Sequence, residues 1–383
     1  MTVWDALAGQ STAIDQLRRA VDGQRHAMSH AWLFTGPPGS GRSVAAKAFA
    51  AALQCADGGC GRCQACLTAL AGTHPDVTWV RTEKLSIGVA EVRDLVRRSA
   101  MVPTSGRWQI LVVEDADRVT EKGADALLRA IEEPSPRTVW MLCAPTADDV
   151  SVTIRSRCRQ VNLVTPSRSA VVALLTGEGI SEDEADFAAR VSQGHIGRAR
   201  ALATNAGQRQ RRADILAVPA RLTSLGGCLT AAAWAVTTAQ DQARRVTDSL
   251  DASEMIELRQ TLGLTDGPTP RGMAGLLKDV EDQQALRAKR LVRDELDAVL
   301  GELTSYYRDV LVIQLGAGAD LINQDLARPI AAAAQAGAAA TTLRQLDAIA
   351  DCRSALAGNV APLLAFEALM VSLGDDTAPR PPA

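Results

Sequence analysis

Gly36-Pro37-Pro38-Gly39-Ser40-Gly41-Arg42-Ser43 is a glycine-rich stretch between an apolar run at residues 31–35 and an alanine-rich segment at residues 44–53. A buried strand, a glycine-rich turn and a helix in this order are typical of a phosphate-binding loop, because the turn offers backbone N–H groups and the positive end of the helix dipole to phosphate oxygens. An ordinary turn between two elements is the alternative. The candidate nucleotide-binding residues of the loop are Gly36, Pro37, Gly39, Ser40, Gly41, Arg42 and Ser43.

The residue before Ser43 is Arg42, where a phosphate-binding loop normally carries a lysine. Lysine reaches the β- and γ-phosphates as a compact charge, whereas the guanidinium of arginine is planar and bulkier. Phosphate binding depends mainly on the backbone of the loop, but hydrolysis needs atoms placed to within a fraction of an ångström. The substitution therefore predicts that hydrolysis is weak or lost while nucleotide, ATP or ADP with Mg²⁺, can still bind.

Strands and helices alternate over the first part of the chain. Apolar runs at residues 77–80, 109–113 and 138–143 predict further buried strands, and residues 89–96 and 124–131 predict helices between them. This alternation predicts a parallel sheet covered by helices on both faces. The predicted fold class is therefore an α/β nucleotide-binding core, followed by helical regions.

Two acidic residues, Glu114 and Asp115, directly follow the predicted strand at residues 109–113. In NTPases of this kind an aspartate at the strand end supports Mg²⁺ and a following glutamate polarises water. Here the order is inverted, so Glu114 is one methylene too long for the first task and Asp115 one too short for the second. The pair is a candidate nucleotide-site element, with two exposed strand-end acids as the alternative, and it too predicts weak hydrolysis.

Four of the eight cysteines lie within a dozen residues, with the spacing C-x4-C-x2-C-x2-C. Four thiolates can surround one tetrahedral Zn²⁺ and leave no position open for a catalytic water. A redox pair and chance clustering are the alternatives. The sequence predicts a structural zinc module at residues 55–66, with the ligands Cys55, Cys60, Cys63 and Cys66.

Composition gives little sign of a nucleic-acid-binding or membrane protein. The 383 residues carry a net charge of −3, which gives no global signal for binding nucleic acid or a membrane surface. No stretch is apolar enough and long enough to span a bilayer, and the first residues contain no basic segment followed by an apolar run. We expect a cytoplasmic protein, in which the thiols stay reduced.

The predicted organisation has four parts. Residues 1–165 form the nucleotide-binding-type core with the cysteine module, and residues 166–207 form a small helical lid. Residues 208–373 contain no strand pattern and predict an all-helical domain, in which residues 261–273 are expected to form a loop. Residues 374–383 are expected to be a frayed tail.

The stretch Ser156-Arg157-Cys158 is the last of several motifs that occur in this order in one known family. The others are the loop, the cysteines, the segments 72–77, 87–95 and 112–117, and the run Leu127-Leu128-Arg129-Ala130-Ile131-Glu132-Glu133-Pro134. Together these resemble the AAA+ clamp-loader subunits of bacterial DNA polymerase III, densely over residues 1–206. The helical part after residue 208 is similar to a clamp-loader collar in general character. Among these subunits, the chain is similar to the type that acts as a rigid stator.

The resemblance implies a function in DNA replication. AAA+-type subunits form a hetero-pentamer held together by their C-terminal helices, in which motor subunits of the tau/gamma type and a delta subunit open a sliding clamp and place it on primed DNA. A stator subunit has little or no ATPase activity of its own. By the same resemblance, Arg157 is an arginine finger offered in trans to the ATP site of a neighbouring motor subunit.

Two family features are displaced in this chain. The strand at residues 138–143 should end in a polar residue that senses the γ-phosphate, and only Thr146 is available nearby. The resemblance also implies a lid arginine at the nucleotide, for which Arg198 is the candidate. An ATP-hydrolysing motor subunit of the same loader is the alternative function, and a stand-alone AAA+ remodelling ATPase is a third.

Direct DNA contact has only weak candidates in the sequence. Arg209, Arg211 and Arg212 cluster at the lid–collar junction, and Arg93, Arg97 and Arg98 lie on one predicted helix. Such runs are usually solvated faces, and residues 287–293 could equally form a collar surface. Any contact would be to the DNA backbone and sensitive to salt.

Overall fold

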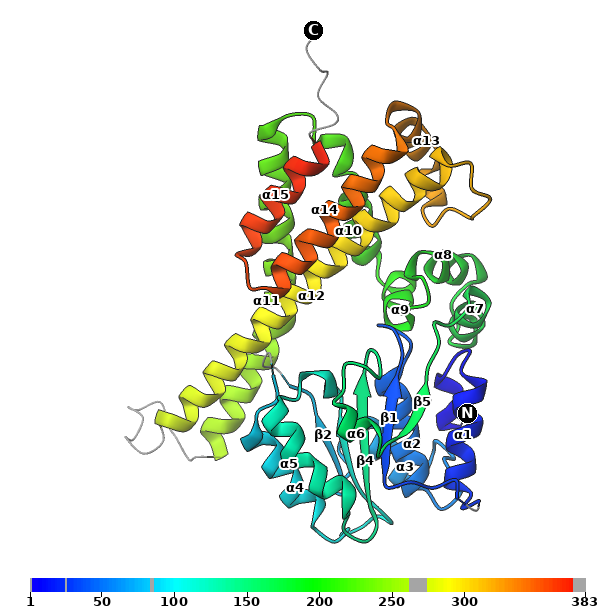
Figure 1. Ribbon diagram of the computed structural model, residues 1–383, viewed down its shortest axis with the longest axis vertical. Helices are drawn as coiled ribbons and strands as arrows, with labels where there is room; N and C mark the ends of the chain where they lie inside the picture. The colour runs from blue at the N-terminus through cyan, green and yellow to red at the C-terminus, as the bar shows by residue number, and fades with distance from the viewer. Residues whose placement is uncertain (1, 25, 83–85, 262–273, 375–383) are drawn as a thin grey trace. The chain divides into compact units, whose positions relative to one another are not determined.

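The computed structural model describes residues 2–24, 26–82, 86–261 and 274–374 (Figure 1). The chain divides into two compact units, and the boundary in the sequence lies between Asn205 and Ala206. The expected loop at residues 261–273 lies almost wholly outside the described residues, as does the expected tail at residues 374–383 beyond Gly374. In the described part of the chain, no helix has both the length and the apolar character needed to cross a membrane.

The first unit is built on a sheet of five parallel strands in the order β2-β3-β4-β1-β5. The expected parallel sheet is therefore confirmed, with β1 between β4 and β5. Leu33 of β1 is aligned with Leu142 of β4 and with Gln160 of β5. The strands are β1 Ala31–Thr35, β2 Val77–Val80, β3 Gln109–Val113, β4 Thr138–Ala144 and β5 Arg159–Asn162.

Helices cover both faces of the sheet because successive strand residues point to opposite sides. Trp32 and Phe34 of β1 pack with the helices that include α1 and α2, whereas Ala31 and Leu33 pack with those that include α4 and α5 (Figure 1). The elements of this part are η1 Val3–Ala6, α1 Ser11–Val21, α2 Arg42–Gln54, α3 Gln64–Ala71, α4 Val89–Ser99, η2 Ala116–Arg118, α5 Glu121–Glu132 and α6 Val152–Arg155.

A buried carboxylate holds the connection between α4 and β3. Both oxygens of Asp76, a residue that is 2% exposed, accept hydrogen bonds from the backbone N–H groups and hydroxyls of Thr104 and Ser105 and from the N–H of Gly106. Although burial opposes the charged form, these donors outweigh it and hold the pKa of Asp76 well below its usual range. The carboxylate therefore fixes the start of β2 relative to the loop that enters β3.

Three short helices follow the sheet and complete the first unit. They are α7 Arg168–Gly177, α8 Glu182–Ser192 and α9 Ile196–Thr204. Ser167 caps α7 through its side chain, and His195 caps α9 in the same way. Their apolar residues, which include Val171, Leu175, Ala188 and Ala199, are buried.

The described residues of the second unit form helices joined by short loops, with no strand among them, as the sequence predicts. Leu296, Leu300, Leu303, Tyr307 and Val310 lie along one face of α12 and are all buried in its core. The elements are α10 Ala206–Leu216, η3 Pro219–Arg221, α11 Leu225–Thr261, α12 Ala274–Gln314, η4 Gln324–Leu326, α13 Ala327–Ala336, α14 Ala339–Ala357 and α15 Pro362–Gly374.

The strand β5 is an element that periodicity did not predict. Its four residues include Arg159, Gln160 and Asn162, and only Val161 is buried. Pairing with β1 on one side alone leaves it an edge strand. A strand this short and polar has no apolar pattern to reveal it.

Candidate functional site

The stretch Gly36–Ser43 forms the turn between β1 and the first residues of α2, as the sequence predicts. Gly39 has a φ of +82°, and a Cβ atom there would lie 2.4 Å from Cγ of His195. At Gly36, a Cβ atom would lie 2.5 Å from the carbonyl oxygen of Leu163. Only glycine fits at these two positions, so the loop is shaped by close approach of the chain after β5 and of the helix α9.

Arg42 is turned onto the loop that contains it. Its Nη1 atom donates a hydrogen bond of 2.9 Å to the carbonyl oxygen of Gly36. This bond links the end of the loop to its first residue. Part of the guanidinium is therefore committed to the loop backbone. Pro37 contributes to the turn in a similar way, since its carbonyl accepts the N–H of Ser40 at 3.1 Å.

The backbone of Ser40 is hydrogen-bonded to Gln10, a residue that the sequence analysis did not identify. Gln10 donates from Nε2 to the carbonyls of Ser40, at 3.2 Å, and of Val164, at 2.7 Å, while its Oε1 accepts the N–H of Val164. Ser40 is 2% exposed, and its hydroxyl has no hydrogen-bond partner among the described residues. Ser43 lies in the first turn of α2, beside the loop.

Glu114 and Asp115 follow β3 as predicted, and the structure brings them near Arg42. Burial chiefly raises the pKa of the Cys143 thiol in β4 to about 12, the negative charge of Glu114 adds to this effect, and the positive charge of Arg42 opposes it. All three side chains therefore act on the same small region at the ends of the strands. Glu114 also lies 3.9 Å from the exposed guanidinium of Arg81.

Asp117 is a further acid of this region that the sequence analysis did not assign to the site. Burial raises its pKa, and the negative charge of Asp115 raises it further, whereas the positive charges of Arg118 and Arg42 lower it. Thr146, the one candidate for a γ-phosphate sensor, is engaged elsewhere. Its hydroxyl and its N–H both donate to Asp149 at 2.8 Å.

The helix α9 lies against the loop through His195. Nδ1 of this histidine accepts the N–H of Arg198 at 3.2 Å, so the proton of the neutral ring is on Nε2. Burial lowers the pKa of His195, and the positive charge of Arg198 lowers it further. The contact brings the start of α9, with the candidate lid residue Arg198, to the phosphate-binding loop. Sequence alone gives no sign that His195 packs on Gly39.

The cysteine cluster is assembled as its spacing predicts. The four sulfur atoms of Cys55, Cys60, Cys63 and Cys66 lie within 4.8 Å of one another. Four thiolates around one Zn²⁺ would be roughly 3.8 Å apart, given Zn–S bonds of about 2.3 Å in a tetrahedron. The group could therefore hold a metal ion with little adjustment.

Hydrogen bonds around the cluster favour thiolate at some of its members. Cys55 is buried, which opposes ionisation, but backbone N–H groups led by those of Cys60, Gly59 and Asp57 lower its pKa to about 6. Backbone N–H groups also lower the pKa of Cys60. Cys66 is 0% exposed, and burial raises its pKa. A cation within the cluster would offset the cost of that burial.

Arg157 lies at the surface of the first unit, just after α6. Its side chain is 40% exposed, and Nη2 is 2.6 Å from Oε1 of Glu132 at the end of α5. Nη1 donates to the carbonyl of Thr153 at 2.8 Å and to the hydroxyl of Ser156 at 3.2 Å. The arginine is therefore accessible to another molecule and held at a defined place.

Two of the arginines considered for DNA contact are committed to the interior of the second unit. Arg212 is 4% exposed and is bound to Asn323, Asp325 and Glu302. Arg211 forms an ion pair with Glu295. For these two residues, phosphate contact is the wrong interpretation, because burial against carboxylates leaves them unavailable.

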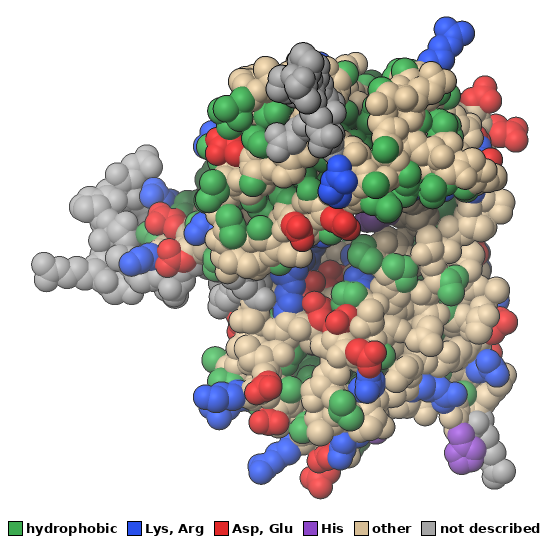
Figure 2. All heavy atoms as spheres, turned by 45° about the horizontal axis from the view of Figure 1, so that its top comes forward, with side chains coloured by type: hydrophobic (Ala, Val, Ile, Leu, Met, Phe, Trp, Pro, Cys, Tyr) green, Lys and Arg blue, Asp and Glu red, His purple; other side chains and the backbone are tan. Residues whose placement is uncertain are grey.

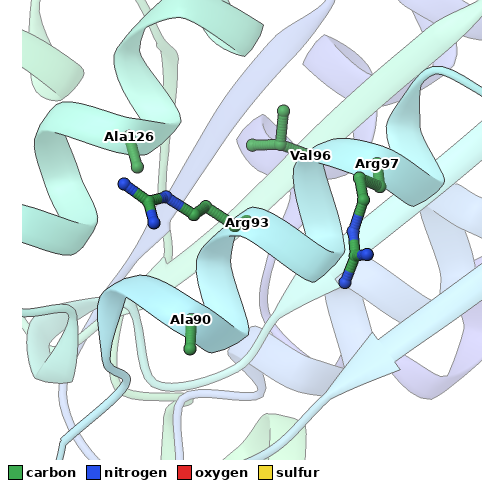
Figure 3. A pocket seen from close by; sticks show the side chains of 5 residues that line it. All are labelled: Ala90, Arg93, Val96, Arg97 and Ala126. Carbon is green, nitrogen blue, oxygen red and sulfur yellow. The ribbon is translucent and has the colours of Figure 1, made fainter.

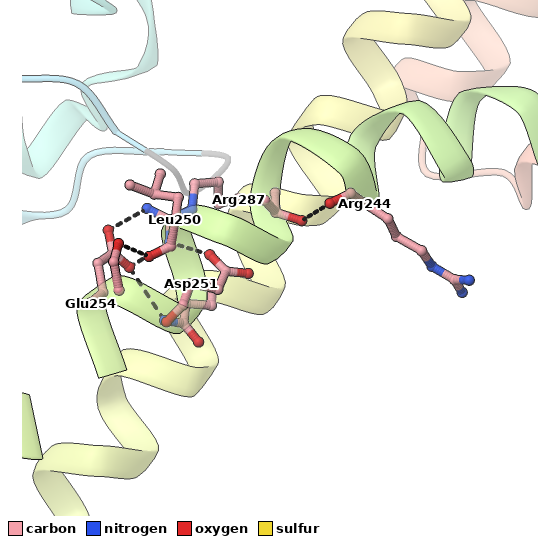
Figure 4. A network of polar contacts seen from close by, with 8 residues as sticks. Arg244, Leu250, Asp251, Glu254 and Arg287 are labelled. Carbon is pink, nitrogen blue, oxygen red and sulfur yellow. Dashed lines mark hydrogen bonds and ion pairs between the residues drawn. The ribbon is translucent and has the colours of Figure 1, made fainter. Parts of the chain in front are cut away.

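A similar network joins the long helices α11 and α12. Arg287 of α12 forms ion pairs with Asp251 and Glu254 of α11, as Figure 4 shows. This hydrogen-bonded pairing lowers the pKa of Glu254. The side chain of Arg287 is only 15% exposed, so it stabilises the helix pair rather than forming a charged surface.

The arginines of α4 remain at the surface. Arg97 and Arg98 are both paired with Asp94, and Arg93 extends toward Ala126 of α5 in a pocket that it lines with Val96 and Arg97 (Figure 3). On the face of the molecule in Figure 2, the described acidic and basic side chains are interspersed. This fits the small net charge of −3.

Two family models match this chain. The family described as DNA polymerase III, delta subunit, matches residues 9–167, and the family described as DNA polymerase III, delta subunit, C terminal, matches residues 280–374. The first match contains the phosphate-binding loop, the cysteine cluster and Arg157. The second lies within the helical unit.

Similar proteins carry names from the same assembly. DNA polymerase III subunit delta′ of Pseudomonas aeruginosa is 37% identical over 39% of this chain and 47% of its own length. Subunit delta′ of Escherichia coli is 33% identical over 45% of this chain and 54% of its own length. DNA polymerase III subunit gamma/tau of Mycobacterium bovis is 30% identical over 47% of this chain and 32% of its own length.

The chain thus spans about half the length of the delta′ proteins it matches. The matches confirm the resemblance to bacterial DNA polymerase III subunits that the sequence analysis drew from the loop, the cysteines and the Ser-Arg-Cys stretch. The two family models together cover well over half of the chain. The chain therefore belongs to the DNA polymerase III delta-subunit family.

Proposed function

We propose that this protein is a delta′-like stator subunit of the bacterial replicative clamp loader, with an AAA+ core that serves a neighbouring ATP site rather than its own. In this role it helps load the sliding clamp onto primed DNA as part of the DNA polymerase III holoenzyme. One observation carries the proposal. The guanidinium of Arg42 is bonded to the carbonyl of Gly36 within the chain's own loop, while that of Arg157 is exposed at the surface.

Weak or absent hydrolysis follows from the residues around the loop. Arg42 replaces the lysine that would reach the β- and γ-phosphates, and its planar head cannot act as the same point charge. Glu114 and Asp115 stand in the inverted order, so neither places its carboxylate at the length that Mg²⁺ support and water activation require. The backbone N–H groups of the loop can still hold phosphate, so ATP or ADP with Mg²⁺ is a possible ligand without being a substrate.

Structural Zn²⁺ is the metal that the cysteine cluster fits best. All four donors are sulfur, which selects Zn²⁺ over hard cations, and a shell of four ligands leaves no position for a reacting water. The metal would tie the end of α2 to the start of α3. The N–H of Val3 donates to the carbonyl of Gly59 within this loop, so the module also anchors the start of the chain.

The parts of the chain have separate tasks in this proposal. Residues 1–165 form the AAA+ core, residues 166–207 the lid that carries Arg198, and residues 208–373 the collar through which the subunits assemble. The partners are motor subunits of the tau/gamma type and a delta subunit in a hetero-pentamer, with the sliding clamp and primed DNA reached through the assembly. Such an assembly works in the cytoplasm.

An ATP-hydrolysing motor subunit of the same loader is the second candidate. The observation in its favour is the similarity to a gamma/tau subunit over 190 residues. Against it stand Arg42 and the Glu114-Asp115 order, which a motor would replace by lysine and by aspartate followed by glutamate.

The stator proposal predicts assembly with motor subunits. We expect the purified chain to form a stable complex with a gamma/tau-type subunit and a delta-type subunit, because the proposed collar provides the contacts between subunits. Sedimentation velocity of the mixture measures this directly, with the chain alone and the partners alone as controls. A chain that sediments independently of both partners at micromolar concentration would contradict the proposal.

A further inference from the structure

The surroundings of Arg157 contain a second residue with a role in the proposed trans site. We propose that Glu132 is a positioning residue that orients the Arg157 guanidinium toward the neighbouring subunit. This inference rests on the proposed function, because it concerns the arginine that is offered to the motor subunit. The evidence is the geometry of the contact between the ends of α5 and α6.

Both ends of the ion pair are anchored in one apolar core. Glu132 directly follows Ile131, which is 0% exposed, and Ile154, three residues before Arg157, is 2% exposed. The two isoleucines belong to the same cluster of buried residues. The backbone of Arg157 is also tied to this core, since its N–H donates to the carbonyl of Ile154 at 3.0 Å. The Cα atoms of Glu132 and Arg157 are therefore fixed relative to each other.

The sequence ends α5 at the residue that makes the contact. The N–H of Glu133 still donates to the carbonyl of Arg129, but Pro134 follows and prevents the helix from continuing. Glu132 is thus the last helical residue, at the negative end of the helix dipole. The carboxylate and the helix terminus both attract the positive charge of Arg157, so they favour the same orientation of the guanidinium.

The contacts leave part of the arginine free for a phosphate group. A guanidinium has five N–H donors. Among the described residues, Nη1 donates to Thr153 and Ser156, and Nη2 faces Glu132 at 2.6 Å. The N–H of Nε and the second N–H of Nη2 remain, and these two nitrogens are bonded to the same carbon of the planar group. This pair of donors is suited to phosphate oxygens, which arginine contacts through two parallel hydrogen bonds.

The exposure of the pair argues against a mainly structural role. The side chains of Arg157 and Glu132 are 40% and 42% exposed, and ion pairs with such exposure contribute little to stability because water and salt screen them. Removing the charge of Glu132 should therefore leave the fold intact. Its effect should appear where orientation matters, namely in the rate of the reaction that Arg157 assists.

The variant Glu132→Gln tests this inference, because it keeps the size of the side chain and removes its charge. In the assembled loader with primed DNA, we expect kcat for ATP turnover to fall about tenfold, because misplacement on the order of 1 Å can cost up to about 10²-fold. KM for ATP should be unchanged, since an interaction made only in the transition state affects kcat alone. Glu133→Gln is the matched control, as Glu133 is an exposed neighbour of the same charge.

A double-mutant cycle separates positioning from other roles. In an Arg157→Ala background, Glu132→Gln should cause no further loss, because the group it orients is gone. A loss that adds to that of Arg157→Ala, an unchanged rate with Glu132→Gln, or a faster rate would overturn the inference. If Arg157→Ala itself leaves turnover unchanged, the trans-arginine function fails; if Arg157→Ala lowers turnover but Glu132→Gln does not, only the positioning role fails.

Discussion

Arg157→Ala should leave this protein folded and lower primed-DNA-stimulated ATP turnover at the neighbouring site by about 10³-fold, the effect typical of an arginine finger. The reason is electrostatic. The guanidinium would stabilise the charge that develops on the transferred phosphoryl group, and water cannot replace it within a closed site. Single-turnover phosphate release by the reconstituted loader measures the step itself.

The arginine two residues earlier provides the control. Arg155 lies on α6, pairs with Asp148 and has a side chain that is 26% exposed. Arg155→Ala should leave phosphate release close to that of the wild type, while complex formation should be normal for both variants. Equal rates for Arg157→Ala and the wild type, in a complex of normal composition, would remove Arg157 from the trans site.

Loss of the metal should have the second large effect. We expect one Zn²⁺ per chain, and we expect Cys55→Ser to abolish zinc binding and to lower the free energy of unfolding of the first unit by at least about 4 kcal/mol, the range typical of losing a structural metal. Cys55 is 1% exposed within the core of that unit, so the cluster is part of the packed structure. Elemental analysis and urea denaturation measure the two quantities.

The matched control for this variant is a buried thiol elsewhere in the first unit. Cys143 lies in β4 and is 0% exposed. Cys143→Ala should retain the full zinc content, although it changes the packing of the core. Protein purified without added metal that contains no zinc would contradict the metal assignment and leave the cluster as a group of reduced thiols.

The parts of the site that sequence could predict are contiguous in the chain. Residue type and short spacing indicate the chemistry of three features: the loop at residues 36–43, the Glu114-Asp115 pair and the four cysteines. The alternation of apolar runs predicted the parallel sheet, because a buried strand needs apolar residues on both faces. These features require no knowledge of how distant segments meet.

The parts that sequence could not predict depend on contacts between distant segments. The packing of His195 on Gly39 and the hydrogen bond from Gln10 to Ser40 join the loop to residues far from it in the chain. The ion pair between Glu132 and Arg157 is of the same kind. Arg212 is an example in which the sequence was misleading. Its basic run suggests an exposed charged surface, but its side chain is buried against carboxylates. Periodicity does not report such pairings.

The rate of ATP turnover by the isolated chain tests the central claim most directly. Purified protein, free of partner subunits, is incubated with ATP and Mg²⁺, and phosphate release is followed with and without primed DNA. We predict release at the background rate under both conditions, because Arg42 and the inverted acidic pair do not form a hydrolytic site. Sustained turnover by the isolated chain, on the order of the 1 s⁻¹ or faster that is typical of enzymes, would contradict the stator account.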